Sequence, residues 1–453
     1  MADLVYPSSN HSVSPENANQ NVTNAPLFKG SNSSLNHQSP GTGVILIRHG
    51  RSTYNEQGRY QGSCDDSVLT EQGRKLAYET GLILKELPID AIYTSPLKRT
   101  QQTAHEIIAA ISTVNDKLPP LRVAETLKEI NIPAWEGLPF QYVREQFSQA
   151  YRCWKEHPHQ FQMGVSGCGD AEVQRYGGDK GEFYQSQIPN PRFPVLELYA
   201  QAQQFWQDIL PHHSGQTILI VSHGGTNRAL ISTAIGLTPN RFHTLQQCNC
   251  GMSVLHFPAG VPQSAQLEAL NLTAHLGKTL PKLKEGRQGL RLLLIPSGDI
   301  HPQQIQKLTQ LLEDVTLNFS INHDRDNAQF TAAQILQYHP ETLQLQVSRN
   351  DFPQVWQQTI DANAASGMMD SQPLLTGLIV ASEAILKRFL GQTLGISTNE
   401  LNHLPLHQGK ISVIHYPCAN QAPVVQGINI GEIGKMREMG EMRERRISKG
   451  TQP

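Results

Sequence analysis

The run Gly43-Val44-Ile45-Leu46-Ile47 decides the fold of the chain, because it is short, aliphatic, rich in β-branched residues and ended by Gly50. Such a run is typical of a strand that is buried on both faces of a sheet. A second run of this kind, Thr217-Ile218-Leu219-Ile220-Val221-Ser222, leads directly into His223. The two runs predict two buried strands.

Helical patterns separate these strands. Thr70 is placed as the N-cap of a helix with apolar residues at helical spacing. Asp90–Thr94 is predicted to be a strand, Ser95-Pro96 is expected to open the next helix, and Val195–Leu210 has a helical pattern. Strands that alternate with helices predict an α/β fold of three layers, α/β/α, around a mainly parallel sheet.

The second half of the chain repeats the first. Ser412–Pro417 repeats Ser253–Pro258 at an offset of 159 residues, which makes chance a poor explanation. Leu294–Gly298 likewise lies over Leu46–Gly50, and Leu378–Ser382 lies over Leu219–His223. The fold is therefore expected twice, over residues 43–278 and 289–431, with the join near Thr279–Gly289.

Three segments lie outside this pattern. Residues 1–42 are rich in Ser, Asn and Pro and are predicted to be a disordered leader. The polar, glycine-rich stretch at about 160–194 is predicted to be an inserted loop, and 432–453 a charged tail.

Composition excludes several classes of partner. The chain has 453 residues and a net charge of -2, so no overall field would hold a nucleic acid or an anionic membrane. No apolar run approaches the roughly 20 residues that span a bilayer. Its six cysteines lack the density and pairing of a secreted scaffold, which favours free thiols and a cytoplasmic location. The oligomeric state stays open.

Two histidines follow strands, where ligands bind in open α/β sheets. They are His49, in Arg48-His49-Gly50, and His223, in His223-Gly224. Phosphoryl transfer needs a nucleophile and cations around the phosphoryl oxygens, and arginine binds such oxygens in a bidentate manner. Arg48 and Arg99 are the candidate cations, and Glu129 is the candidate acid for the leaving oxygen. Each residue alone is more often structural, so the prediction rests on the constellation.

Five motifs in order resemble the histidine phosphatase superfamily, which includes cofactor-dependent phosphoglycerate mutases and many phosphatases. They are Leu46–Asn55, Arg59–Gly62, Thr94–Ala104, Leu127–Glu129 with Trp135–Gly137, and Val221–Gly224.

The resemblance implies a role for each matching residue. His49 would be the phosphorylated nucleophile; Arg48, Arg99 and His223 would hold the phosphoryl group; and Glu129 would donate the proton. Asn55, Gln61, Gly62 and Gly224 would contact the substrate, a small phosphorylated metabolite. The resemblance implies neither a metal nor a cofactor.

Hydrolysis of the phosphate ester is favoured over the mutase reaction, which moves the phosphoryl group within the substrate. The mutase branch carries an adjacent arginine pair after the acid motif, whereas this chain has Leu138-Pro139-Phe140 there. Arg175 and Lys180 in the insertion could replace those cations, so a phosphoglycerate mutase is the alternative enzyme, and a binding scaffold is the alternative from another class. Trp154–Pro158, Pro194–Leu198 and Cys248–Leu255 resemble plant-type 2-carboxy-D-arabinitol-1-phosphatases, with phosphoserine as another candidate substrate.

The second unit is predicted to be degenerate. Pro296 and Ser297 replace Arg48 and His49, and Ser382 replaces His223. A pseudo-enzyme repeat that packs against the first unit is the expected role.

Overall fold

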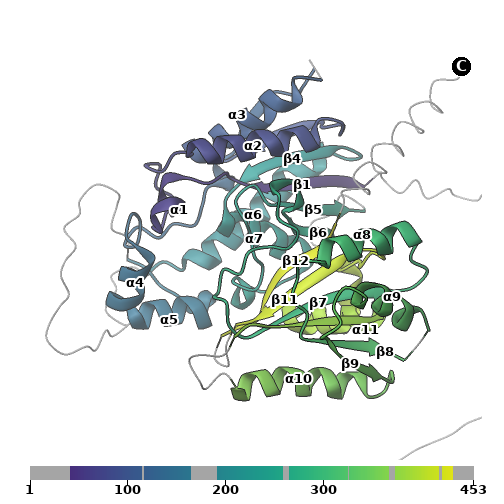
Figure 1. Ribbon diagram of the computed structural model, residues 1–453. Helices are drawn as coiled ribbons and strands as arrows, with labels where there is room; N and C mark the ends of the chain where they lie inside the picture. The colour runs from purple at the N-terminus through teal and green to yellow at the C-terminus, as the bar shows by residue number, and fades with distance from the viewer. Residues whose placement is uncertain are drawn as a thin grey trace, which may run out of the picture. The chain divides into compact units, whose positions relative to one another are not determined.

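A single sheet contains both halves of the chain (Figure 1). The structure is a computed structural model that describes residues 41–114, 117–164, 191–258, 265–324, 326–366, 373–417 and 421–431. In these residues the sheet has twelve strands, in the order β3-β2-β4-β1-β5-β6-β12-β11-β7-β10-β8-β9. The strands are β1 (Thr42–Arg48), β2 (Ala91–Thr94), β3 (Leu121–Val123), β4 (Thr217–Ser222), β5 (Met252–Phe257), β6 (Gln266–Leu272), β7 (Leu290–Ser297), β8 (Phe319–His323), β9 (Leu343–Val347), β10 (Leu375–Ser382), β11 (Ile411–Tyr416) and β12 (Val424–Ile430).

Each half of the sheet has the same arrangement. In the first half β1, β4, β2 and β3 pair in parallel, while β5 and β6 are antiparallel. In the second half β7, β10, β8 and β9 pair in parallel, while β11 and β12 are antiparallel. The predicted fold class is confirmed, because the mainly parallel α/β arrangement occurs twice. In the second half β7 occupies the position that β1 occupies in the first.

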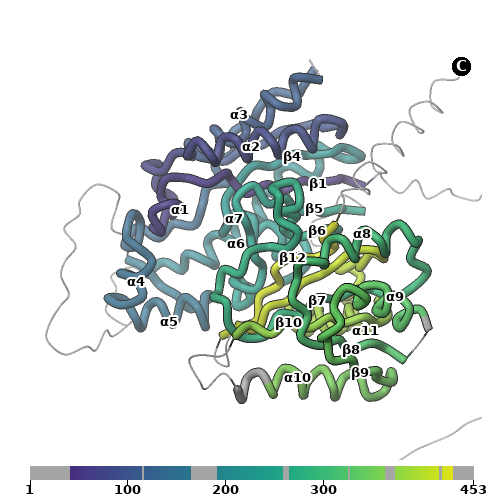
Figure 2. The backbone as a smooth tube through the Cα atoms, viewed as in Figure 1, coloured from purple at the N-terminus to yellow at the C-terminus, as the bar shows by residue number. Residues whose placement is uncertain are grey.

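Helices cover both faces of the sheet (Figure 2). They are α1 (Thr53–Gln57), α2 (Glu71–Leu84), α3 (Lys98–Ile111), α4 (Phe140–Gln146), α5 (Ser148–Glu156), α6 (Pro194–Ile209), α7 (Gly224–Ile235), α8 (Pro302–Leu312), α9 (Asp326–Leu336), α10 (Phe352–Ser366) and α11 (Glu383–Leu394). Ile45 and Ile47 of β1 pack in the core beneath α2 and α3, whereas Val44 and Leu46 join the core that includes α6 and α7. This alternation follows from the two-residue period of a strand and explains why β1 is apolar throughout.

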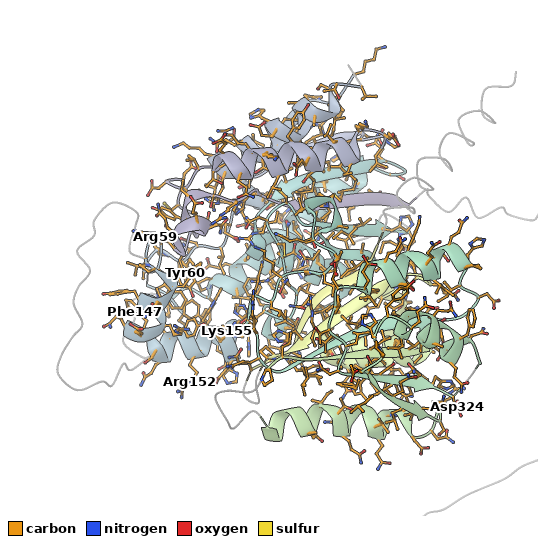
Figure 3. All side chains as sticks on the ribbon, in the orientation of Figure 1. Arg59, Tyr60, Phe147, Arg152, Lys155 and Asp324 are labelled. Carbon is orange, nitrogen blue, oxygen red and sulfur yellow. The ribbon has the colours of Figure 1, made fainter. Side chains whose placement is uncertain are left out.

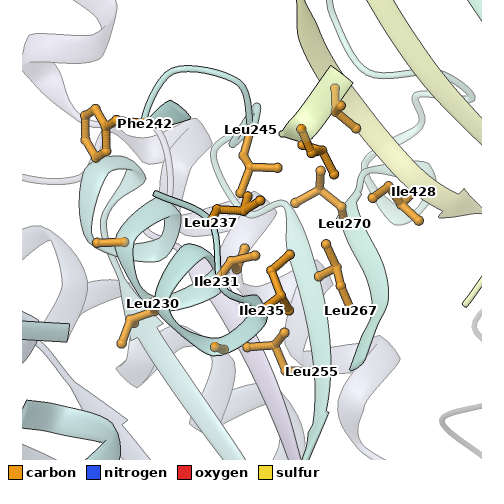
Figure 4. Close-up of a cluster of buried hydrophobic side chains, with 14 of the residues drawn as sticks. Leu230, Ile231, Ile235, Leu237, Phe242, Leu245, Leu255, Leu267, Leu270 and Ile428 are labelled. Carbon is orange, nitrogen blue, oxygen red and sulfur yellow. The ribbon is translucent and has the colours of Figure 1, made fainter. Parts of the chain in front are cut away.

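One hydrophobic core crosses from the first half to the second. The antiparallel strands β6 and β12 meet with Leu270 opposite Ile428, and both side chains are fully buried. Figure 4 shows Ile428 beside Leu267 and Leu270 at this junction. The same apolar cluster continues to Phe389 on α11, so the two repeats share a core on this face of the sheet.

Several local predictions can be compared with the structure. Thr70 caps α2 as expected, because its side chain accepts a hydrogen bond from the Gly73 amide at 3.0 Å. The prediction that Ser95-Pro96 opens a helix is wrong: α3 begins at Lys98. The N-cap is Leu97, and the Ser95 hydroxyl in the preceding loop contacts His223 Nε2 at 2.7 Å and the Leu97 amide at 3.4 Å.

Residues 1–40 of the predicted leader, most of the insertion and the charged tail lie outside the described residues, as do Arg175 and Lys180. The predicted end of the leader at residue 42 is wrong, because Thr42 is buried as the first residue of β1. The two ends of the insertion are joined by a bridge between Met163 and Arg192, with backbone hydrogen bonds of 3.0 and 2.9 Å. The segment between them therefore leaves and rejoins the fold at adjacent points. No helix in the described part of the chain is long and apolar enough to cross a membrane.

Candidate active site

The two predicted histidines lie side by side at the carboxyl ends of neighbouring strands. Arg48, the last residue of β1, pairs with Ser222, the last residue of β4, so His49 and His223 follow at the same edge. Their ring centroids are 5.4 Å apart and their planes are inclined at 62°. Both side chains are buried, with 2% and 0% exposed. The parallel pairing of β1 and β4 therefore builds the centre of the site.

The His49 ring is oriented by its own loop. Nδ1 lies 2.8 Å from the Gly50 carbonyl oxygen, which can only accept, so the proton resides on Nδ1 and the lone pair on Nε2. Burial, then the positive charges of Arg48 and Arg99, hold the pKa of His49 well below its usual range. The imidazole is thus neutral near pH 7, with Nε2 as a potential nucleophile.

Two guanidinium groups, that of Arg99 buried and that of Arg48 half-buried, flank the histidines. Arg99, on the first turn of α3, donates to the carbonyl oxygens of Cys64 and Gly62, each at 2.8 Å. Arg48 donates to the Gln247 carbonyl oxygen at 2.9 Å. Burial lowers the pKa of Arg99 to about 10, which still leaves it charged at neutral pH. Among the described residues the Nε atoms of both arginines have no hydrogen-bond partner, so each retains a donor.

His223 is fixed by the loop before α3. Its Nε2 atom and the Ser95 hydroxyl are 2.7 Å apart, while Nδ1 has no partner among the described residues. Burial, then the charges of Arg99, His49 and Arg48, lower the pKa of His223 well below its usual range. Both imidazoles of the site are therefore neutral in this arrangement.

Glu129 lies at the amino-terminal end of α7. Its carboxyl oxygens accept hydrogen bonds from the amides of Gly225 and Thr226, each at 3.0 Å, and from the Ile130 amide at 2.9 Å. A helix N-terminus presents such unsatisfied N–H groups. A Cβ atom at position 225 would lie 2.4 Å from a Glu129 oxygen, so only glycine permits this approach.

The predicted substrate-contact residues border the same edge. Asn55 and Gln61 both accept from the Ser52 hydroxyl, at 3.1 and 2.9 Å. Gly62 has a positive φ of 53° and brings its carbonyl to Arg99. Gly224 leaves room for Arg48, because a Cβ atom there would lie 3.3 Å from Arg48 Nε. All nine predicted site residues thus belong to one connected region, whose catalytic roles stay predictions.

Sequence reasoning missed Asn249. Its side-chain amide donates to the carbonyl oxygens of His49 and Gly50, at 2.9 and 3.1 Å, and to the side chain of Asn55 at 2.9 Å. It therefore ties the nucleophile loop to α1. The signal was the stretch Cys248–Leu255, which contains Asn249 and resembles the plant-type phosphatases; the flanking Cys248 and Cys250 are free and buried.

The fold and site together define an α/β protein with a twin-histidine, twin-arginine centre at the ends of parallel strands. The model of the histidine phosphatase superfamily, branch 1, matches residues 44–176 and 170–270, which cover the whole of this site. The chain belongs to this superfamily.

Known relatives include phosphatases and mutases. A probable 2-carboxy-D-arabinitol-1-phosphatase from Arabidopsis thaliana is 35% identical over 241 residues, which are 52% of this chain and 43% of the relative. Phosphoserine phosphatase 1 from Hydrogenobacter thermophilus is 29% identical over 52% of this chain and 94% of its own length. A 2,3-bisphosphoglycerate-dependent phosphoglycerate mutase from Arabidopsis thaliana is 30% identical over 45% of this chain and 60% of the relative. The chain thus spans less than half of the length of the first of these relatives.

The corresponding edge of the second repeat has different residues. Pro296 pairs with Ala381 in β7 and β10 as Arg48 pairs with Ser222 in β1 and β4, so Ser297 and Ser382 come next, in the places of His49 and His223. Ser382 is the N-cap of α11, as His223 is the N-cap of α7. The backbone frame has been kept while the imidazoles and the guanidinium group have been replaced.

Proposed function

We propose that the chain is a phosphomonoesterase that forms a phosphohistidine on His49. The observation that carries this proposal is the Nδ1 contact of His49 with the Gly50 carbonyl, which leaves the lone pair of the neutral ring on Nε2. Arg48 and Arg99 supply positive charge for the phosphoryl oxygens, the main requirement of phosphoryl transfer.

The reaction is proposed to occur in two steps. Nε2 attacks phosphorus as the ester bond breaks, and the protonated carboxyl group of Glu129 gives its proton to the leaving oxygen. Water then attacks the phosphohistidine, Glu129 takes a proton from it, and phosphate leaves. His223 and the two arginines hold the phosphoryl group throughout, while Asn55, Gln61, Gly62 and Gly224 contact the rest of the substrate.

The substrate is proposed to be a small phosphorylated metabolite. The relatives named for 2-carboxy-D-arabinitol-1-phosphate and phosphoserine support a sugar acid phosphate or phosphoserine. The relatives named as mutases favour phosphoglycerate mutase as the second candidate function. Product analysis with 3-phosphoglycerate separates the two, because a mutase yields an isomer and a phosphatase yields inorganic phosphate.

The proposed mechanism uses guanidinium charge where other phosphatases use a metal. We therefore propose that hydrolysis proceeds without metal or cofactor. We also propose a cytoplasmic setting; the four cysteines in the described part of the chain, Cys64, Cys153, Cys248 and Cys250, are free, in keeping with a reducing compartment.

The deciding experiment compares the full chain with its His49→Ala variant in the presence of a chelator. The substrates are phosphoserine, 2-carboxyarabinitol 1-phosphate and 3-phosphoglycerate, and acid-labile phosphoprotein is trapped during turnover. We expect the parent to release phosphate and the variant to lose both turnover and the trapped species. Full activity in the variant, or loss of the parent's activity on chelation, would contradict the mechanism.

The boundaries of the two units, 43–278 and 289–431, are part of the proposal, with the second as a pseudo-enzyme repeat. A Ser297→Ala variant tests it, since Ser297 occupies the place of His49. We expect turnover to stay within about twofold of the parent, the range expected of a surface substitution away from the site. A loss as large as that of His49→Ala would show that the second repeat takes part in the chemistry.

A further inference from the structure

A lysine from the segment between the repeats reaches the site. Residues 279–289 join the two halves, and within them the Lys284 ammonium group donates to the Gln247 carbonyl oxygen. The same oxygen accepts from Arg48 at 2.9 Å. Two cations therefore converge on one acceptor beside the proposed nucleophile, and the charge of Lys284 also contributes to the low pKa of His49.

The local charges are not balanced by the protein. Protein atoms around its ammonium group, and then the charges of Arg48 and Arg228, lower the pKa of Lys284, although the residue keeps an exposed surface. The adjacent acid, Glu285, forms an ion pair with Lys155, with 2.9 Å between the charged atoms. Figure 3 labels Lys155 and Tyr60, which lie in the same region of the molecule. Like charges held together in this way favour an anionic ligand.

Arg228 adds to this positive region. It lies on α7, donates through Nε to the Leu245 carbonyl at 2.8 Å, and stacks over Phe242 with 5.5 Å between Cζ and the ring centroid. Its pKa is lowered by burial and then by Arg48. A phosphomonoester dianion carries about two negative charges, which Arg48 and Arg99 match. Lys284 and Arg228 are further positive charges, beyond what one phosphoryl group requires.

The buried amide of Gln247 is a second indication of a ligand. The residue is 1% exposed, and neither its side-chain oxygen nor its nitrogen has a partner within the described part of the chain. A buried polar group without a partner costs about 1–3 kcal/mol, so such groups mark places where a ligand or water binds.

We propose that Lys284, reinforced by the charge of Arg228, binds a carboxylate that the phosphomonoester substrate carries. This inference rests on the proposed phosphatase function and assigns the residue that recognises the carboxylate shared by its candidate substrates. The carboxylate would accept the charge-assisted hydrogen bond that Lys284 now gives to Gln247, while Arg48 and Arg99 hold the phosphoryl group.

The second repeat positions this lysine. The carbonyl oxygen of Lys282 accepts from Gln246 at 3.0 Å and from Gln426 of β12 at 3.4 Å. Nearer the far end of the segment, the Gln288 carbonyl lies 2.9 Å from His415 Nε2 on β11. The second repeat thereby contacts the segment that carries Lys284 to the site of the first repeat.

The test uses pairs of phosphomonoesters that differ by one carboxylate. Phosphoserine is compared with phosphoethanolamine, and 3-phosphoglycerate with glycerol 3-phosphate. The variants are Lys284→Met, the conservative Lys284→Arg, and the control Arg287→Met, an exposed cation of the same segment. We expect Lys284→Met to raise the KM for phosphoserine and 3-phosphoglycerate about 10- to 100-fold. The KM for phosphoethanolamine and glycerol 3-phosphate should change less than about threefold. Lys284→Arg should restore most of the lost affinity for the carboxylates.

Binding in the His49→Ala background separates the two proposals. Titration calorimetry of His49→Ala should show tighter binding of the carboxylate member of each pair, and addition of Lys284→Met to this variant should remove that preference. If the parent releases no phosphate but this preference appears, the phosphatase proposal fails and the carboxylate site stands. Equal losses for both members of each pair, or no measurable binding of any of the four compounds, would overturn the role of Lys284.

Discussion

Asn271 and Asn429 make equivalent hydrogen bonds across the junction of the two repeats. Asn271 on β6 donates to the Gln426 carbonyl of β12 at 2.7 Å, and Asn429 on β12 donates to the Glu268 carbonyl of β6 at 2.8 Å. Both residues have a φ of 54°, in the left-handed region that asparagine tolerates better than most residues. The two repeats are thus joined by a pair of reciprocal contacts, as in a two-fold symmetric dimer built from one chain.

Replacement of Asn271 should destabilise the whole molecule. Asn271→Ala removes its buried hydrogen bonds and places alanine at a positive φ, which together should cost about 2–5 kcal/mol. Asn271→Gly removes only the hydrogen bonds and should cost less, while Asn399→Ala, on an exposed position, should cost almost nothing. Denaturant unfolding measures the three variants. Because one core spans both repeats, a single transition is expected; separate transitions for the two halves would contradict this view.

Ser95 should control the orientation of His223. Ser95→Ala removes the only hydrogen bond that the structure shows for this imidazole and should lower kcat about 10- to 100-fold, because a misplaced phosphoryl ligand weakens the transition state. The fold should be kept. Ser112→Ala at the exposed end of α3 is the control. Steady-state kinetics decides, and unchanged kcat in Ser95→Ala would show that His223 is held by packing alone.

The strands and their end residues could be predicted from local sequence. A run such as Thr217–Ser222 is apolar enough to identify a buried strand, and parallel strands bring their carboxyl ends together, so His49 and His223 were expected to meet. The repeat was visible for the same reason, since core positions preserve their pattern.

Contacts between distant residues could not be predicted in this way. Asn249 contacts the His49 carbonyl across 200 residues, and no local pattern distinguishes such an asparagine from a turn residue. Ser95 likewise contacts His223, which is 128 residues away in the chain. The β6–β12 pairing and the Lys284 contact likewise depend on how the two repeats meet, which periodicity does not specify.

The protein should lose stability when the pH falls below the ordinary pKa of histidine. Burial lowers the pKa of His49, His223 and His243 in the folded state, so below about pH 6.5 the unfolded chain binds more protons. The contribution of these three histidines to stability is therefore constant above this pH and falls as the pH decreases below it. Denaturation midpoints between pH 5 and 8 measure the effect. His243→Phe changes a residue outside the proposed chemistry and should reduce the slope of the denaturation midpoint against pH. A slope equal to that of the parent would assign the acid sensitivity to other groups.

Gly225 should be as necessary for catalysis as the acid that it accommodates. A Cβ atom at this position would lie 2.4 Å from a Glu129 oxygen, so Gly225→Ala must displace the carboxyl group from the start of α7. We expect a loss in kcat of about 10²–10⁴-fold, the range for a general acid, matching that of Glu129→Gln. A leaving group of low pKa, such as p-nitrophenol, needs no proton, and both variants should recover most of their activity with its phosphate ester. Gly298→Ala, in the second repeat, should leave turnover unchanged because the three atoms nearest to its new methyl group all belong to the flexible Gln408 side chain. If Gly225→Ala lost activity equally with both leaving groups, Glu129 would act on phosphoryl binding instead of proton transfer.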